Sequence, residues 1–163
     1  KVSMPLPRLP LYVVISETVT FVVSMSFYLI FMLLTGVPMT FKLLLLVPFV
    51  YAVQQIFAFS LGFLFATLSV FLRDLRELVN IIMQLWFWFT PIIYMKELLP
   101  SFAQRLLLLN PATYFIDSYH QIFFFDQLPD FRLLIVLTVM GHILLLMAYT
   151  FFKKLEKEVR DFL

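Results

Sequence analysis

Residues 41–72 read FKLLLLVPFVYAVQQIFAFSLGFLFATLSVFL, and this stretch decides the fold. Its one charged residue is Lys42, beside its first residue. An α-helix needs about 20 predominantly apolar residues to cross the hydrocarbon core of a bilayer. The stretch is longer than that, so it predicts a membrane-crossing helix that tilts or extends past the bilayer.

The composition of the whole chain supports the same interpretation. Of the 163 residues, 63% are hydrophobic and 13% are charged, whereas a soluble domain has about 45–50% and about 25%. A water-soluble fold would have no place for the 21 phenylalanines. The net charge of +2 gives no indication of a nucleic-acid partner, and the lack of cysteine excludes disulfides and thiolate metal sites.

Three more stretches are apolar enough to cross a membrane. They are residues 11–35, 78–94 and 133–152, the last ending at a pair of lysines. We therefore expect an all-α integral membrane protein with four transmembrane helices in a single domain over 1–163. The chain opens on Lys1 without a signal-peptide pattern, so we expect it to be a fragment of a longer protein.

Residues 96–125 are harder to place. Asn110-Pro111 splits two short apolar halves, and such a pair is typical of a turn. Neither half is long enough to cross alone. They could form one broken fifth span, or a re-entrant helical hairpin that enters and leaves on the same side.

The distribution of basic residues favours the hairpin. With four spans, eight basic residues share one side and four share the other: Lys1, Arg8, Arg73, Arg76, Lys153, Lys154, Lys157 and Arg160 against Lys42, Lys96, Arg105 and Arg132. A fifth span would remove this bias. Because basic residues concentrate on the cytoplasmic side of membrane proteins, we expect both ends of the chain to be cytoplasmic and the hairpin to be outside.

The turn between the second and third spans carries four charges. Asp74 can cap the next helix with Glu77 as the second half of a capping box, and Arg73 can pair with Glu77. Two interpretations of Arg73, Asp74, Arg76 and Glu77 stay open. They form a well-capped cytoplasmic turn, or they contact a cytoplasmic partner.

An aromatic run ends the third span and also has two interpretations. Its residues include Trp86, Trp88, Phe89, Thr90, Pro91 and Tyr94. They form an aromatic belt at the outer interface, or they line a conduit in which aromatic rings stack on sugar rings. Asp117 and His120 in the hairpin fit polar contacts in a water-filled vestibule, because two separated histidines do not make a metal site.

Several of these segments together resemble one family, the ABC-2 type permeases. Residues 61–75 are similar to the segment of these permeases that ends in Phe-Arg-Asp, and residues 90–94 are similar to their Ser/Thr-Pro-Ile-x-Tyr segment. Residues 109–111 are similar to their Leu-Asn-Pro turn. Residues 2–5 and 9–10 are similar to the entry of a middle span. The subgroup that the chain resembles most exports lipid-linked polysaccharide, O-antigen or teichoic acid.

The resemblance implies an architecture and partners. Such permeases have six spans, so this chain would hold the last four and lack an interface helix and two spans. They work as homodimers in the cytoplasmic membrane of bacteria or archaea, each half docked on a separate subunit that binds ATP and Mg. No cofactor is expected in this chain, which contains no Gly-rich phosphate-binding loop.

The resemblance also assigns expected roles to residues. The conduit and outer gate would include Trp86, Trp88, Phe89, Thr90, Pro91, Tyr94, Asn110, Pro111, Asp117, Tyr119 and His120. The surface that couples to the ATP-binding subunit would include Lys1, Pro5, Arg8, Arg73, Asp74, Arg76 and Glu77.

Three alternatives stay open. The first is an ABC-2 exporter of a drug, lipid or peptide. The second is a membrane-embedded transferase acting on lipid-linked sugar, which would need carboxylates or histidines converging at one membrane depth. The third is a structural membrane protein, which would need neither mid-membrane polar groups nor an ATPase partner.

Overall fold

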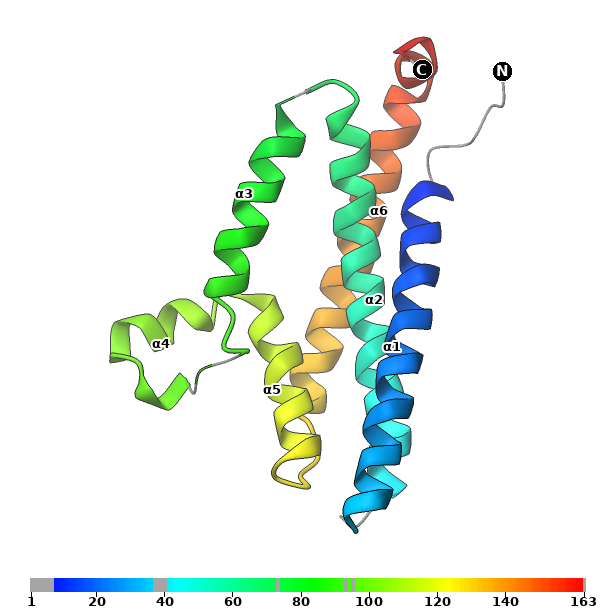
Figure 1. The fold of residues 1–163 in the computed structure, drawn as a ribbon. Helices are drawn as coiled ribbons and strands as arrows, with labels where there is room; N and C mark the ends of the chain where they lie inside the picture. Colours follow the sequence, from blue (N-terminus) through cyan, green and yellow to red (C-terminus); the bar gives the residue numbers. More distant parts are fainter. Residues whose placement is uncertain (1–7, 37–40, 73, 93, 95, 163) are drawn as a thin grey trace.

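The regular secondary structure is helical throughout the part of the chain that the structure, a computed structural model, describes: residues 8–36, 41–72, 74–92, 94 and 96–162. The elements are α1 (Arg8–Thr35), α2 (Phe41–Ser69), α3 (Leu75–Trp88), the short 3-10 helix η1 (Lys96–Leu98), α4 (Ser101–Leu107), α5 (Pro111–Phe123) and α6 (Phe131–Phe162). Figure 1 shows α1, α2 and α6 as long, roughly parallel rods. This confirms the all-α expectation.

Three helices are long and apolar enough to cross a membrane. They are Leu11–Thr35, Leu44–Ser69 and Phe131–Leu155, and they correspond to the first, second and fourth predicted spans. The second helix ends at Ser69, before the predicted end at residue 72. Its last turn closes with the Leu68 carbonyl oxygen accepting hydrogen bonds from the amides of both Phe71 and Leu72, at 3.1 Å each.

The third predicted span differs most from its expected bounds. It was expected at 78–94, whereas α3 has 14 residues and ends at Trp88. At 1.5 Å per residue it measures about 21 Å, short of the roughly 30 Å of hydrocarbon. The helix stops because Pro91 lacks an N–H and its ring clashes with a helical carbonyl one turn earlier. The Thr90 amide donates instead to the Phe87 carbonyl oxygen at 3.1 Å, which makes a tighter turn than the α-helix. A fourth crossing stays a prediction.

The core lies around α2, which packs against α6, α5 and α1. Val47 and Val50 of α2 and Leu134 of α6 are almost fully buried. Where α2 and α6 approach most closely, the Ser60 hydroxyl lies 2.8 Å from the carbonyl oxygen of Gly141. A Cβ at Gly141 would lie 3.3 Å from Ile56 Cγ2 and 3.4 Å from the Phe57 backbone, so the two helices pack tightly at this glycine.

Figure 1 also shows which segments share an end of the bundle. The start of α1, the turn between α2 and α3, and the end of α6 lie at one end, and the loop between α5 and α6 lies at the other. Helices α3 and α5 lie end to end along the bundle, while η1 and α4 project to one side. The predicted turn at Asn110-Pro111 is present, since α5 begins at Pro111 with Asn110 as its N-cap.

Candidate outer gate and cavity

The side chain of Asn110 joins the end of α3 to the start of α5. Its Nδ2 donates to Phe89 O at 3.1 Å and to Thr90 Oγ1 at 2.9 Å. Its Oδ1 accepts from the amide of Ala112 at 2.9 Å and from Trp86 Nε1 at 2.5 Å. A primary amide offers two donors and two acceptor lone pairs, so these four bonds use its whole capacity.

Thr90 closes the same network from the α3 side. Its side chain is 4% exposed, and its hydroxyl donates to the Trp86 carbonyl oxygen at 2.8 Å. Trp86, Phe89, Thr90, Asn110 and Pro111, five of the residues predicted for the outer gate, therefore meet here. We call this meeting point of the end of α3 and the start of α5 the joint. Beside it lies a groove of about 390 Å³, which is lined by Trp86, Phe89, Asn110, Pro111 and apolar neighbours from α3 and α4.

A second and larger cavity opens beside the C-terminal half of α5. Its volume is about 910 Å³. Pro91, Tyr94, Asp117 and His120, four residues predicted for the outer gate, line it. Further side chains that the sequence did not single out also line it: Lys96, Gln121, Phe124, Phe125 and Gln127.

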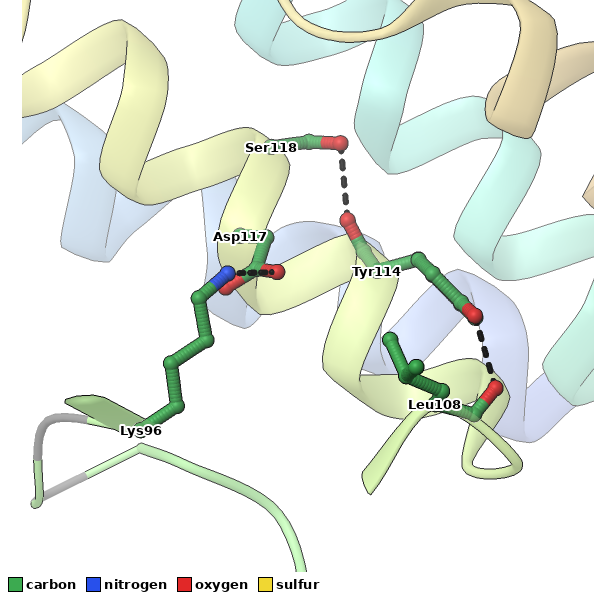
Figure 2. Close-up of polar contacts among 5 residues, drawn as sticks. All are labelled: Lys96, Leu108, Tyr114, Asp117 and Ser118. Atoms are coloured by element: carbon green, nitrogen blue, oxygen red, sulfur yellow. Dashed lines mark hydrogen bonds and ion pairs between the residues drawn. The ribbon is translucent and has the colours of Figure 1, made fainter. Parts of the chain in front are cut away.

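An ion pair crosses this cavity. The Nζ atom of Lys96 in η1 lies 2.6 Å from Oδ2 of Asp117 in α5, and Figure 2 shows the lysine side chain reaching across to the helix. The side chains are 45% and 23% exposed, so water screens the pair only in part. On another face of α5, the Tyr114 hydroxyl donates to the Leu108 carbonyl oxygen at 2.6 Å and so holds the chain that leads from α4 (Figure 2).

The loop after α5 folds back over the cavity. The amide of Gln127 donates to the Gln121 carbonyl oxygen at 2.8 Å, and Asp126 has the left-handed φ of 49° that this reversal requires. The His120 ring meets the Phe124 ring edge to face at 5.6 Å. The reversal brings the side chains of Gln121 and Gln127 to one cavity and leaves Phe124 and Phe125 exposed.

The predicted gate residue Tyr119 lies elsewhere. Its hydroxyl donates to Gln54 Oε1 of α2 at 2.9 Å, and its ring stacks on Phe123. It therefore packs between α5 and α2 and does not line the cavity. Trp88 is 69% exposed on α3, where its carbonyl oxygen accepts from the Tyr94 hydroxyl at 3.1 Å.

The predicted coupling residues are placed only in part. Asp74, Arg76 and Glu77 are exposed at the turn between α2 and α3. The capping-box prediction is wrong, because Asp74 occupies the N-cap position with an αR backbone and its side chain makes no capping hydrogen bond; a capping side chain needs a β-region backbone. Lys1, Pro5 and Arg73 lie outside the described residues, and Arg8 begins α1.

Among the described residues no group of three or more His, Cys, Asp or Glu side chains could hold a metal ion. Glu17 is exposed on α1. On α6, Nδ1 of His142 lies 2.8 Å from the carbonyl oxygen of Thr138, one turn earlier. Polar side chains meet both at the Asn110 network and at the cavity, but those of the network are bonded to one another. Of these two places, the cavity is the one whose polar side chains face space that a hydroxyl-rich or amide-bearing ligand can fill.

Three long apolar helices around a shared core are typical of a polytopic helical membrane protein. Residues 3–124 match the model of the ABC-2 type transporter family, and the chain belongs to that family. It is 31% identical over 163 residues to the O-antigen export system permease protein RfbA of Myxococcus xanthus, with 99% of this chain and 62% of that protein covered. It is 27% identical to a protein of the same description from Klebsiella pneumoniae, again over 62% of that protein.

The chain therefore spans about 62% of the length of these relatives. In Figure 1, α1, α2 and α6 run side by side, and α3 and α5 lie end to end on one side of them. The match covers both α3 and the joint, since Trp86, Thr90, Asn110 and Pro111 all fall within residues 3–124. The joint thus belongs to the part of the molecule that the family model describes.

Proposed function

We propose that the chain is the larger part of the permease subunit of an ATP-driven exporter that moves a lipid-linked polysaccharide across the cytoplasmic membrane. The observation that carries this proposal is the combination of the family match with two relatives described as O-antigen export permeases. The permease makes and breaks no bonds of its substrate. A separate nucleotide-binding subunit hydrolyses ATP, and two permeases form a homodimer.

In this proposal the polypeptide crosses the membrane four times. Helices α3 and α5 lie end to end (Figure 1) and have 14 and 13 residues, or about 40 Å together. Joined through Asn110, they span the bilayer as one discontinuous element, with η1 and α4 inserted between its two halves. This arrangement places α5 in the crossing, whereas the sequence led us to expect it in a re-entrant hairpin over residues 96–125. Irregular backbone at membrane depth is tolerated where protein or a water-filled cavity surrounds it.

The end that carries Asp74, Arg76 and Glu77 faces the cytoplasm. The positive-inside bias supports this orientation, and the start of α1 and the end of α6 share that end (Figure 1). The nucleotide-binding subunit docks there, together with the segment around Arg8. Its closure on ATP shifts the spans as rigid bodies and opens the conduit.

A pull-down of the full-length permease tests this assignment. Co-expressed with an ABC-type ATP-binding subunit from the same genome, the permease should retain that subunit through purification in detergent. Replacing Arg76→Glu together with Glu77→Arg should reduce its recovery. Arg105→Glu, a charge reversal in α4 away from that end of the bundle (Figure 1), should leave recovery unchanged.

Export itself is the second measurement. Depleting the permease should leave lipid-linked glycan on the cytoplasmic side, where added glycosidases cannot reach it in intact cells. Recovery of the permease without any ATP-binding subunit would remove the basis of the proposal. Normal surface glycan after depletion would also contradict it.

A further inference from the structure

The cavity of about 910 Å³ beside α5 has the chemistry of a carbohydrate site. Its volume is near the upper end of the roughly 300–1,000 Å³ of small-molecule sites. That is enough for a short segment of sugar rings. We infer that this cavity binds an uncharged, hydroxyl-rich stretch of glycan during export. The inference rests on the proposed function and adds a specific binding site to it.

The polar groups of the cavity match sugar hydroxyls. The side chains of Gln121 and Gln127 each offer two N–H donors and an acceptor oxygen, and the 2.8 Å backbone bond between these residues fixes their spacing. His120 adds ring nitrogens from the same face of α5. A hydroxyl is both donor and acceptor, so mixed groups of this kind satisfy it more completely than a row of like charges.

Aromatic rings supply the second part of the match. Tyr94, Phe124 and Phe125 line the cavity, and the last two are 77% and 65% exposed. The faces of sugar rings carry C–H groups, which pack on aromatic faces without fixed direction. Rings that are already exposed can take such a partner without first breaking a packed core. A polymer can therefore shift from one unit to the next with a small change in contact energy.

Charge decides the class of glycan. Among the described residues that line the cavity, the carboxylate of Asp117 and the ammonium of Lys96 face each other at 2.6 Å. The two charges cancel, so the cavity carries no net charge from these groups. An anionic sugar therefore gains no net electrostatic attraction on entering, which makes neutral units the better fit.

The test uses the full-length permease in complex with its ATP-binding subunit, reconstituted in nanodiscs. Phe125 is replaced by the photoreactive amino acid p-benzoylphenylalanine. Three fluorescent neutral probes are offered: a malto-, a manno- and a chito-oligosaccharide. Illumination should attach at least one of them, and the unlabelled probe should compete. The same photoreactive residue at Leu146, which is exposed on α6 away from the cavity, should capture none.

Variants then locate the site. The double variant Gln121→Met and Gln127→Met keeps side-chain length but removes hydrogen bonding, and capture should fall by about tenfold or more. Gln104→Met is the matched control, because Gln104 lies in α4, donates to the Leu99 carbonyl oxygen and does not line the cavity. Each variant must still co-purify with the ATP-binding subunit. That retention distinguishes loss of the site from loss of folding.

Three results would overturn the inference. They are no capture of any neutral probe at position 125, equal capture by the glutamine double variant, and capture of a galacturonate oligosaccharide as strong as that of the neutral probes. A glycolipid headgroup has the same hydroxyl chemistry, so competition by free oligosaccharide distinguishes a polymer site from a lipid site. If export proceeds while capture fails, the site is wrong and the permease assignment stands. If export of glycan fails in the unmodified complex, the assignment itself is wrong.

Discussion

The Nδ2 atom of Asn110 lies 2.9 Å from Oγ1 of Thr90, although α4 and η1 separate the two residues in the chain. This bond belongs to a network that joins α3 to α5 at the point where both helices end. A backbone break at membrane depth would otherwise leave polar groups without partners. The Asn110 side chain gives partners to two of these groups, the Phe89 carbonyl oxygen and the Ala112 amide.

Replacing Asn110→Ala should weaken both helix ends at once. It removes the α5 cap, which is worth about 1 kcal/mol, and it leaves the Trp86 indole N–H without its acceptor. We expect the free energy of unfolding to fall by about 2–4 kcal/mol. Thermal unfolding of the detergent-purified full-length protein measures this loss.

Asn110→Asp separates the two roles of this side chain. It keeps the oxygen that accepts from Ala112 and Trp86 but replaces both donors with a carboxylate oxygen that faces the Phe89 carbonyl oxygen. Its loss should therefore be at least as large as that of the alanine variant at neutral pH and should shrink at a pH low enough to protonate the carboxyl. Asn80→Ala, an exposed position on α3, serves as the control and should have little effect. A loss at Asn110 no larger than at Asn80 would show that the joint does not hold the helices.

The contact between α2 and α6 gives a prediction with a matched control. An added Cβ at Gly141 would lie 3.3 Å from Ile56 Cγ2 and 3.4 Å from the Phe57 backbone, whereas one at Gly62 would meet nothing within 4 Å. Gly141→Ala should therefore lower the free energy of unfolding by about 1–3 kcal/mol. Gly62→Ala should leave it unchanged or raise it by up to about 1 kcal/mol, because alanine favours helix. Equal effects at the two glycines would rule out close helix approach as the cause.

The Lys96–Asp117 ion pair should contribute little to stability. Both groups are partly exposed, and exposed pairs are worth about 0.2–1 kcal/mol. A double-mutant cycle with Lys96→Met and Asp117→Asn should give a coupling in that range, smaller in high salt. Export by the single variants is measured in parallel. A coupling well above this range would show that the pair is shielded from water.

The topology of the hairpin can be tested at Arg105. The chain has no cysteine, so Arg105→Cys introduces a single thiol into this part of the protein. With any other cysteine of the full-length protein replaced by serine, a membrane-impermeant maleimide added to intact cells should label it. Arg76→Cys should react only after the cells are opened. Labelling of Arg105→Cys from the cytoplasmic side alone would refute the four-crossing arrangement.

The long helices could be predicted from hydropathy because a helix makes its backbone hydrogen bonds within itself. A long apolar stretch is therefore enough to identify one. Residues 11–35 and 133–152 lie within α1 and α6 for this reason. The same measure placed the end of the third span too late. Apolar side chains continue to Tyr94, but Pro91 interrupts the backbone hydrogen bonds three residues after Trp88, and a hydropathy window does not register a missing N–H.

The candidate site was predicted as a set of residues but not as an arrangement. Tyr119 was grouped with Asp117 and His120, yet each residue turns a helix by about 100°, so Tyr119 faces α2 while the other two face the cavity. The same periodicity would have added Gln121, which lies one turn after Asp117. Nothing in the sequence pattern indicates that Asn110 would bond to Thr90, because that pairing depends on how α4 returns the chain.

Helix α3 has no buried residue, and the side chains of Ile82 and Leu85 are more than half exposed. Because α3 buries none of its side chains in the described part of the chain, a change in its tilt disrupts little packing there. The energetic cost of such a tilt would fall on the turn at Asp74 and on the Asn110 network. We therefore expect hydrogen exchange to be faster at these two points than in α2.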